Sequence, residues 1–201
     1  MKILENKVEL VGNKYYENMV RKCERSARTC YQSKRSKSLE DAEKFLYKLM
    51  KINHGSIIEH ECLTFKIRTD RACANQIVRH RIASYSQEST RYIDLSDFDI
   101  VLDQSYSNEE RKLIKSLCEE IQAKYKCFDR KDKARAVLPL CTATTLIMTM
   151  NLRELRHFLK LRLDKAAHQS IKEVAYQIYK IMENKYPVFV KDIGEMINER
   201  D

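Results

Sequence analysis

The chain has 201 residues, of which 38 are Lys or Arg and 29 are Asp or Glu, giving a net charge of +9. This length is enough for one domain with a sizeable core that needs neither disulfides nor a metal ion. No apolar run reaches about 18 residues and the N-terminus carries charges, so we expect neither a membrane span nor a signal peptide. The seven cysteines are scattered and form no C-x-x-C pair, so we expect a reduced, cytoplasmic protein whose cysteines act as small buried residues.

In the first half of the chain, strands and helices alternate. Residues 2–11 are predicted to form a strand and residues 14–30 a helix. Residues 38–53 (SLEDAEKFLYKLMKIN) begin with a capping pattern and continue at helical spacing. Residues 61–69 (ECLTFKIRT) alternate like a strand. A helix capped by Thr69 or Asp70 should then run to about Ala83, followed by a polar loop over residues 84–91.

The second half is richer in helices. Ser107 and Glu110 predict a capped helix that reaches Phe128. Residues 140–151 (LCTATTLIMTMN) favour a buried strand, and residues 151–164 (NLRELRHFLKLRLD) favour a helix with one apolar face. A long helix should follow from about Lys165 to Tyr186 and end at Pro187. These elements predict an α+β fold, a single domain over residues 1–201 with a small central sheet flanked by several helices.

Two common kinds of binding site are missing from the sequence. Glycine occurs only at positions 12, 55 and 194, so no glycine-rich loop can hold a phosphate through its backbone amides. The five histidines and seven cysteines do not stand at the spacing of zinc ligands, and we expect no metal site. A nucleotide ligand would therefore have to be bound by side chains.

Basic and hydroxyl side chains concentrate in residues 79–92, RHRIASYSQESTRY. On the predicted helix, Gln76, Arg79 and His80 stand at i, i+3 and i+4, which would put them on one face. Arginine binds phosphate through two parallel hydrogen bonds, and hydroxyl groups add further donors. An ordinary solvated helix end would also explain the arginines, because cations are stabilised there, but it explains the hydroxyl groups poorly.

The same stretch resembles the signature of the flavin-dependent thymidylate synthases (ThyX), in which R-H-R is followed after seven residues by serine. Other segments match that family in the same order along the chain: HGSIIEHECLTFKI (54–67), ARAVLP (134–139) and NLRELRHFLKLRLD (151–164). The resemblance covers roughly residues 54–185. It implies a ThyX-like domain that binds FAD through side chains and acts as a homotetramer with active sites shared between chains.

The resemblance also implies which residues form the site. The residues implied to bind FAD are Ser56, Arg79, His80, Arg81, Gln87, Asn151, Arg153 and His157. The residues implied to bind dUMP are Gln76, Arg79, Gln87, Glu88, Ser89, Thr90, Arg91, Arg135 and Arg162. Arg162 takes the catalytic position, where a permanent cation beside the uracil would favour its N3-deprotonated form.

The implied reaction is the reductive methylation of dUMP to dTMP, with 5,10-methylenetetrahydrofolate as carbon donor and NADPH as the reductant of FAD. At residues 167–172 the chain has AHQSIK where the family usually has A-Q-W-E-I-R. A related flavin enzyme that adds a different one-carbon group to a pyrimidine nucleotide therefore remains an alternative. Nucleic-acid binding, suggested by the charge, ranks lower because no nucleic-acid motif is present. A membrane partner is not expected.

Overall fold

A four-stranded antiparallel sheet lies at the centre of the molecule in the computed structural model, which describes residues 1–30 and 32–198. Its strands, in spatial order, are β2 (Lys7–Val11), β3 (Cys62–Asp70), β6 (Ala143–Asn151) and β4 (Ala83–Gln87). The two long strands, β3 and β6, pair along their whole length, from Cys62 opposite Asn151 to Asp70 opposite Ala143. β4 is therefore an edge strand, paired only with β6.

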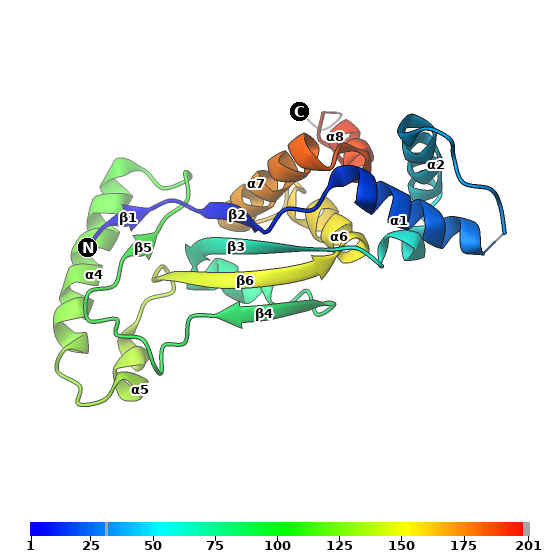
Figure 1. Ribbon diagram of the computed structural model, residues 1–201. Helices are drawn as coiled ribbons and strands as arrows, with labels where there is room; N and C mark the ends of the chain where they lie inside the picture. The colour runs from blue at the N-terminus through cyan, green and yellow to red at the C-terminus, as the bar shows by residue number, and fades with distance from the viewer. Residues whose placement is uncertain (31, 199–201) are drawn as a thin grey trace.

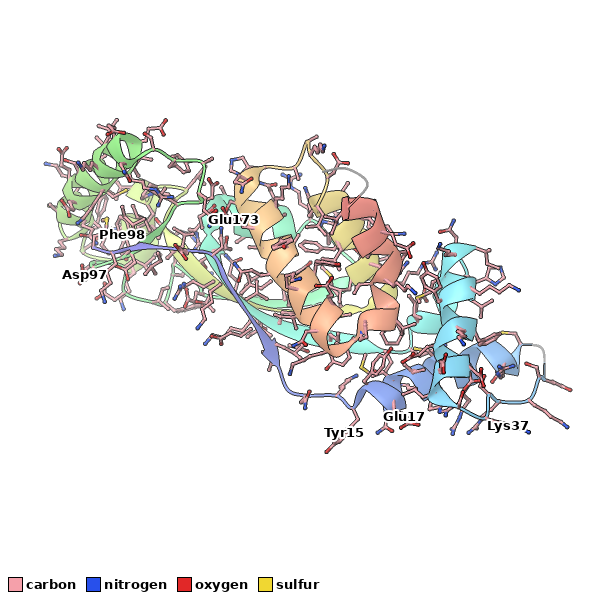
Figure 2. All side chains as sticks on the ribbon, turned by 90° about the horizontal axis from the view of Figure 1, so that it is seen from above. Tyr15, Glu17, Lys37, Asp97, Phe98 and Glu173 are labelled. Atoms are coloured by element: carbon pink, nitrogen blue, oxygen red, sulfur yellow. The ribbon has the colours of Figure 1, made fainter. Side chains whose placement is uncertain are left out.

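One face of the sheet carries the main hydrophobic core. Every second residue of β6 is buried, and its buried Met148 lies opposite the buried Phe65 of β3, as the two-residue period of a strand requires. Helices α3 (Arg71–Ile77), α6 (Leu152–Arg162) and α7 (Gln169–Lys185) pack on this face, and Figure 2 shows α7 crossing above the strands. Burial of each large apolar side chain, compared with its exposure to water, stabilises the fold by about 1.5–3 kcal/mol.

The remaining elements lie at the two ends of the sheet (Figure 1). At one end are α1 (Tyr16–Thr29), α2 (Leu39–Lys51) and η1 (Gly55–Ile58), with η3 (Pro187–Phe189) and α8 (Lys191–Asn198) beside them. At the other end α4 (Asn108–Tyr125), α5 (Lys131–Ala134) and η2 (Arg135–Val137) surround the parallel pair β1 (Ile3–Leu4) and β5 (Ile100–Val101). Phe98, Ile100 and Cys118 belong to a second, smaller core at that end.

The α+β fold class and most predicted elements are confirmed. The side chain of Ser38 accepts a hydrogen bond from the Asp41 amide at 3.1 Å, and Ser107 and Glu110 form a complete capping box. The predicted first strand is split into β1 and β2, and the long C-terminal helix begins at Gln169 rather than near Lys165. The prediction of a single domain over residues 1–201 includes residues 31 and 199–201, which lie outside the described residues.

The region between residues 70 and 91 differs from the prediction. The helix that begins after Asp70 ends at Ile77, and residues 83–87 form β4 instead of a loop. The hydroxyl of Tyr85 donates to the carbonyl oxygens of Ile77 and His80, at 2.9 and 2.8 Å, and so fastens the turn between helix and strand. The alternation in ASYSQ was hard to recognise because Tyr85 is its only large inward-facing side chain.

The cysteines are all free in the described residues. Cys23, Cys73 and Cys118 are buried as expected. Cys30, Cys62 and Cys127 are exposed, so the prediction that the cysteines serve as buried apolar residues was wrong for these. In the described part of the chain, no helix is long and apolar enough to cross a membrane, and no group of three His, Cys, Asp or Glu side chains is arranged to hold a metal ion.

Candidate functional site

A buried histidine joins the turn after α3 to helix α6. His80 is only 6% exposed. Its Nδ1 lies 3.2 Å from Oε1 of Glu154, and its Nε2 accepts a hydrogen bond from Nε of Arg162 at 3.1 Å. The ring of Phe158 packs edge-on against the imidazole, with centroids 4.9 Å apart. The three partners of His80 therefore all come from α6.

The local sequence explains why α6 presents these three side chains together. The side-chain oxygen of Asn151 caps the helix by accepting from the Glu154 amide at 2.9 Å. Glu154, Phe158 and Arg162 then stand at i, i+4 and i+8, which places them along one stripe of the helix. Helical side chains lean toward the N-terminus, so the long Arg162 side chain reaches back toward His80.

The surroundings of His80 favour its neutral form. Burial lowers the pKa of His80 because it disfavours the imidazolium cation, and the nearby Arg162 and His157 act in the same direction. The hydrogen bond and negative charge of Glu154 oppose this effect without reversing it. His157, 6.1 Å away between ring centroids, is itself exposed on α6.

A second group of polar side chains lies at the opposite end of β4. The side-chain amide of Gln87 and Nη1 of Arg71 both donate to Oγ1 of Thr144, at 3.2 and 3.4 Å. Burial lowers the pKa of Arg71, and the neighbouring cation of Arg135 lowers it further, whereas Glu88 raises it. The charge of Arg71 is thus felt by one carboxylate, Glu88, and by a second guanidinium, Arg135. This gathering of positive charge suits an anionic ligand.

The turn that follows β4 carries the remaining hydroxyl groups. The carbonyl oxygen of Ser89 accepts from the amides of Tyr92 and Ile93, and its side-chain oxygen lies 3.4 Å from the Arg91 amide nitrogen. Thr90 is buried, whereas Arg91 is exposed. The Arg91 side chain therefore lies on the surface, where its guanidinium carbon is 5.6 Å from the centroid of the Tyr92 ring.

A third group lies around η1 and the outer face of α6. Nη1 of Arg153 lies 2.5 Å from Oε1 of Glu59, and both side chains are about half exposed. The Arg153 side chain also covers Gly55, where an added Cβ would come within 3.0 Å of its Nε. Ser56, the next residue, is exposed. This group holds an accessible cation next to a small-residue position.

Most of the predicted site residues thus fall into three groups in one chain, and no hydrogen bond or ion pair joins these groups within residues 1–30 and 32–198. The expectation that Gln76, Arg79 and His80 share a helix face was wrong, because α3 ends at Ile77. Arg79 and Arg81 are exposed, whereas His80 between them is buried. Two cavities of about 490 and 550 Å³ lie elsewhere, and no predicted site residue lines either of them.

Arg71 and Glu154, to which we assign roles in the site below, were not predicted from the sequence. Arg71 lies in the first turn of α3, where the helix dipole disfavours a cation, and that unfavourable placement is a usable signal. Glu154 is buried on a helix whose other inward residues are mostly apolar. A carboxylate spaced four and eight residues from Phe158 and Arg162 could have indicated a buried partner.

The chain is similar to one family of known proteins, both in its match to a family model and in its sequence relatives. The family model described as "Thymidylate synthase complementing protein" (Thy1) matches residues 13–188. A flavin-dependent thymidylate synthase from Thermococcus onnurineus is 39% identical over 150 residues, which are 69% of this chain and 61% of the relative. One from Geobacter sulfurreducens is 35% identical over 184 residues, covering 84% and 79%. The chain therefore spans less than two thirds of the Thermococcus relative.

Two solved structures share the fold. The crystal structure of the flavin-dependent thymidylate synthase ThyX from Helicobacter pylori, complexed with FAD and dUMP, has a TM-score of 0.79, 21% identity, and coverage of 92% of this chain and 98% of that one. The UMP/dUMP methylase PolB from Streptomyces cacaoi, bound with 5-Br dUMP, has a TM-score of 0.77, 23% identity, and 94% coverage of both chains. At these identities the likeness supports the fold alone.

Proposed function

This chain belongs to the Thy1 family, which includes the flavin-dependent thymidylate synthases, and from that premise we propose that it converts dUMP to dTMP by reductive methylation. The carbon donor would be 5,10-methylenetetrahydrofolate, and NADPH would be the reductant. The observation that carries the proposal is the R-H-R stretch and its partners: His80 bonded to Arg162 at 3.1 Å, with exposed arginines on either side. We place the enzyme in the cytoplasm and treat residues 1–201 as one such domain.

The proposed cofactor is FAD, and the donors on the surface fit it. Arg79, Arg81 and Arg153 are exposed guanidinium groups, which suit a diphosphate better than any backbone loop of this glycine-poor chain does. The proposed FAD-binding residues are Ser56, Arg79, His80, Arg81, Gln87, Asn151, Arg153 and His157. When bound, the flavin would supply the hydride transfer, while the protein supplies binding and orientation.

The proposed substrate site combines a uracil contact with phosphate contacts. Nε of Arg162 is occupied by His80, which leaves the two Nη atoms to face the nucleotide base. The permanent charge of Arg162 would stabilise the N3-deprotonated uracil. The proposed substrate-binding residues are Gln76, Arg79, Gln87, Glu88, Ser89, Thr90, Arg91, Arg135 and Arg162. To these we add Arg71, which shares Thr144 with Gln87.

We propose that the working enzyme is a homotetramer whose active sites are shared between chains. The separation of the site residues into three groups supports this arrangement, because within the described residues no hydrogen bond or ion pair joins the groups and neither of the two cavities is lined by them. A second copy could bring one group opposite another. Neighbouring chains commonly complete each other's sites in symmetric oligomers.

The absorption spectrum of the purified protein, with and without dUMP, tests the proposed cofactor directly. We expect a yellow protein whose flavin bands change when dUMP is added. A colourless protein that does not take up added FAD would contradict the proposal. The alternative, a related enzyme that transfers a different one-carbon group, predicts the same spectrum and is separated from the first by the mass of its nucleotide product.

A further inference from the structure

The hydrogen bonds on the two sides of His80 determine where its proton lies. Nε of an arginine is always a donor, because the guanidinium keeps its protons at any working pH. Nε2 of His80, at 3.1 Å from that donor, must therefore be the unprotonated acceptor. A neutral imidazole has one proton, which must then lie on Nδ1 and point at Oε1 of Glu154, 3.2 Å away.

The burial, helix position and bonding partner of Glu154 all suit a carboxylate that holds His80. Its side chain is 11% exposed, and it lies in the first turn of α6, where the helix dipole stabilises a negative charge. Within the described residues, His80 is the partner of its carboxylate. Arg156, two residues on, pairs instead with Asp192 at 2.7 Å. A buried carboxylate devoted to one imidazole fixes both the tautomer and the orientation of that ring.

We propose that Glu154 is a positioning residue that acts through His80 to hold the guanidinium of Arg162 in its working orientation. The inference rests on the proposed function for the contact between Arg162 and the substrate. Glu154 anchors Nδ1–H, the ring transmits that orientation, and Nε2 holds Nε of Arg162 so that the two Nη atoms remain available. The triad joins a carboxylate, a neutral imidazole and a guanidinium, so its charges balance.

The position of the proton can be measured without any ligand. A two-bond ¹H–¹⁵N spectrum distinguishes protonated from unprotonated ring nitrogens, and the His80 signals are assigned by their loss in His80→Asn. We expect a proton on Nδ1 and none on Nε2 of His80 at pH 7. A proton on Nε2 would overturn the proposal. This result does not depend on whether the protein makes dTMP, so it is separate from a failure of the proposed function.

Variants at the two ends of the triad should move the titration of His80 in opposite directions. The ionisable side chains facing His80 are Glu154, Arg162 and His157 from α6, while the hydroxyl of Tyr85 from β4 donates to the His80 carbonyl oxygen. Glu154→Gln removes a negative charge and should lower the pKa of His80. Arg162→Gln removes a positive charge and should raise it. Glu119→Gln, at an exposed position of α4, is the matched control and should leave the pKa of His80 unchanged.

Kinetic measurements then distinguish a positioning role of Glu154 from a purely structural one. Glu154→Ala should lower kcat on the order of 100-fold, because a misplaced guanidinium loses its orientation. Glu154→Gln keeps an acceptor oxygen for Nδ1–H and should restore most of that loss. If both variants lose stability but keep the wild-type titration of His80, Glu154 is only structural and the proposal is wrong. If wild-type protein forms no dTMP while the proton lies on Nδ1, the proposed function fails and the triad stands.

Discussion

Arg153 and Glu59 form an ion pair in which Nη1 of the arginine lies 2.5 Å from Oε1 of the glutamate. The pair joins α6 to the residue that follows η1. Both side chains are about half exposed, so the pair contributes at most about 1 kcal/mol to stability. A phosphate that binds Arg153 must therefore compete with Glu59, but only weakly.

This competition predicts opposite effects of two substitutions on FAD binding. Arg153→Ala should weaken FAD binding, since the phosphate loses a charged donor. Glu59→Gln should strengthen it by about fivefold or less, the equivalent of about 1 kcal/mol, since a competing negative charge is removed. Titration of FAD into apoprotein, followed by flavin fluorescence, measures both. Weaker FAD binding in Glu59→Gln would show that Arg153 does not hold the cofactor phosphate.

Arg71 should bind the phosphate of dUMP. Its partly buried guanidinium lies beside Arg135 and shares Thr144 with Gln87. A hydrogen bond to a charged group contributes about 1.5–3 kcal/mol, so Arg71→Ala should raise KM for dUMP by about 10- to 100-fold. Steady-state kinetics measure this, with the exposed Arg130→Ala as the matched control. An unchanged KM for dUMP would remove Arg71 from the site.

Glu24 should make stability depend on pH in the acid range. Its buried carboxylate accepts from the Ser36 amide at 2.7 Å and from Arg28 and Arg21. Burial alone would raise its pKa, but the hydrogen bonds from Ser36 and the two arginines lower it from 4.5 to about 2. A lowered carboxyl pKa gives stability that is fully present above pH 4.5 and is lost as the pH falls toward 2.

The test of this dependence is Glu24→Gln, which should cost on the order of 2 kcal/mol of unfolding free energy at pH 7. The difference from wild type should shrink as the pH falls from 4.5 toward 2, because wild-type Glu24 becomes protonated too. Chemical denaturation across this range measures both proteins. A difference that stays constant with pH would mean that the Glu24 charge does not stabilise the fold.

Shared active sites predict that two inactive variants restore each other. Arg79 is exposed, whereas the neighbouring His80 is buried and accepts a hydrogen bond from Arg162. Within one chain, Arg79 and Arg162 therefore lie in different environments. We expect Arg79→Ala and Arg162→Ala to be inactive alone. Hybrid oligomers, co-expressed with two affinity tags, should recover about a quarter of wild-type activity, because random mixing pairs the intact halves at that frequency. Hybrids without activity would place both arginines of each site on one chain.

Sequence patterns predicted the fold well where periodicity was strong. The alternation in β3 and the capping residues Ser38 and Ser107 were sufficient, because local rules and burial agree there. Sequence patterns failed to predict β4. Its short polar residues show no strong periodicity, and the hydrogen bonds of Tyr85 to residues outside the strand determine the turn before it. Glu154 was missed because its role depends on His80, which is 74 positions away in the chain. Apart from Arg71, which we added from the structure, the proposed ligand contacts came from the resemblance, and all of them stay predictions.

The proposed activity is tested most directly by identifying the nucleotide that the purified protein forms from dUMP. The reaction contains FAD, 5,10-methylenetetrahydrofolate and NADPH, and the product is identified by mass spectrometry, with Arg162→Ala as the inactive control. We predict dTMP, formed by wild type and lost in the variant. A hydroxymethylated nucleotide would support the alternative enzyme, and unchanged dUMP with FAD bound would contradict the proposed activity.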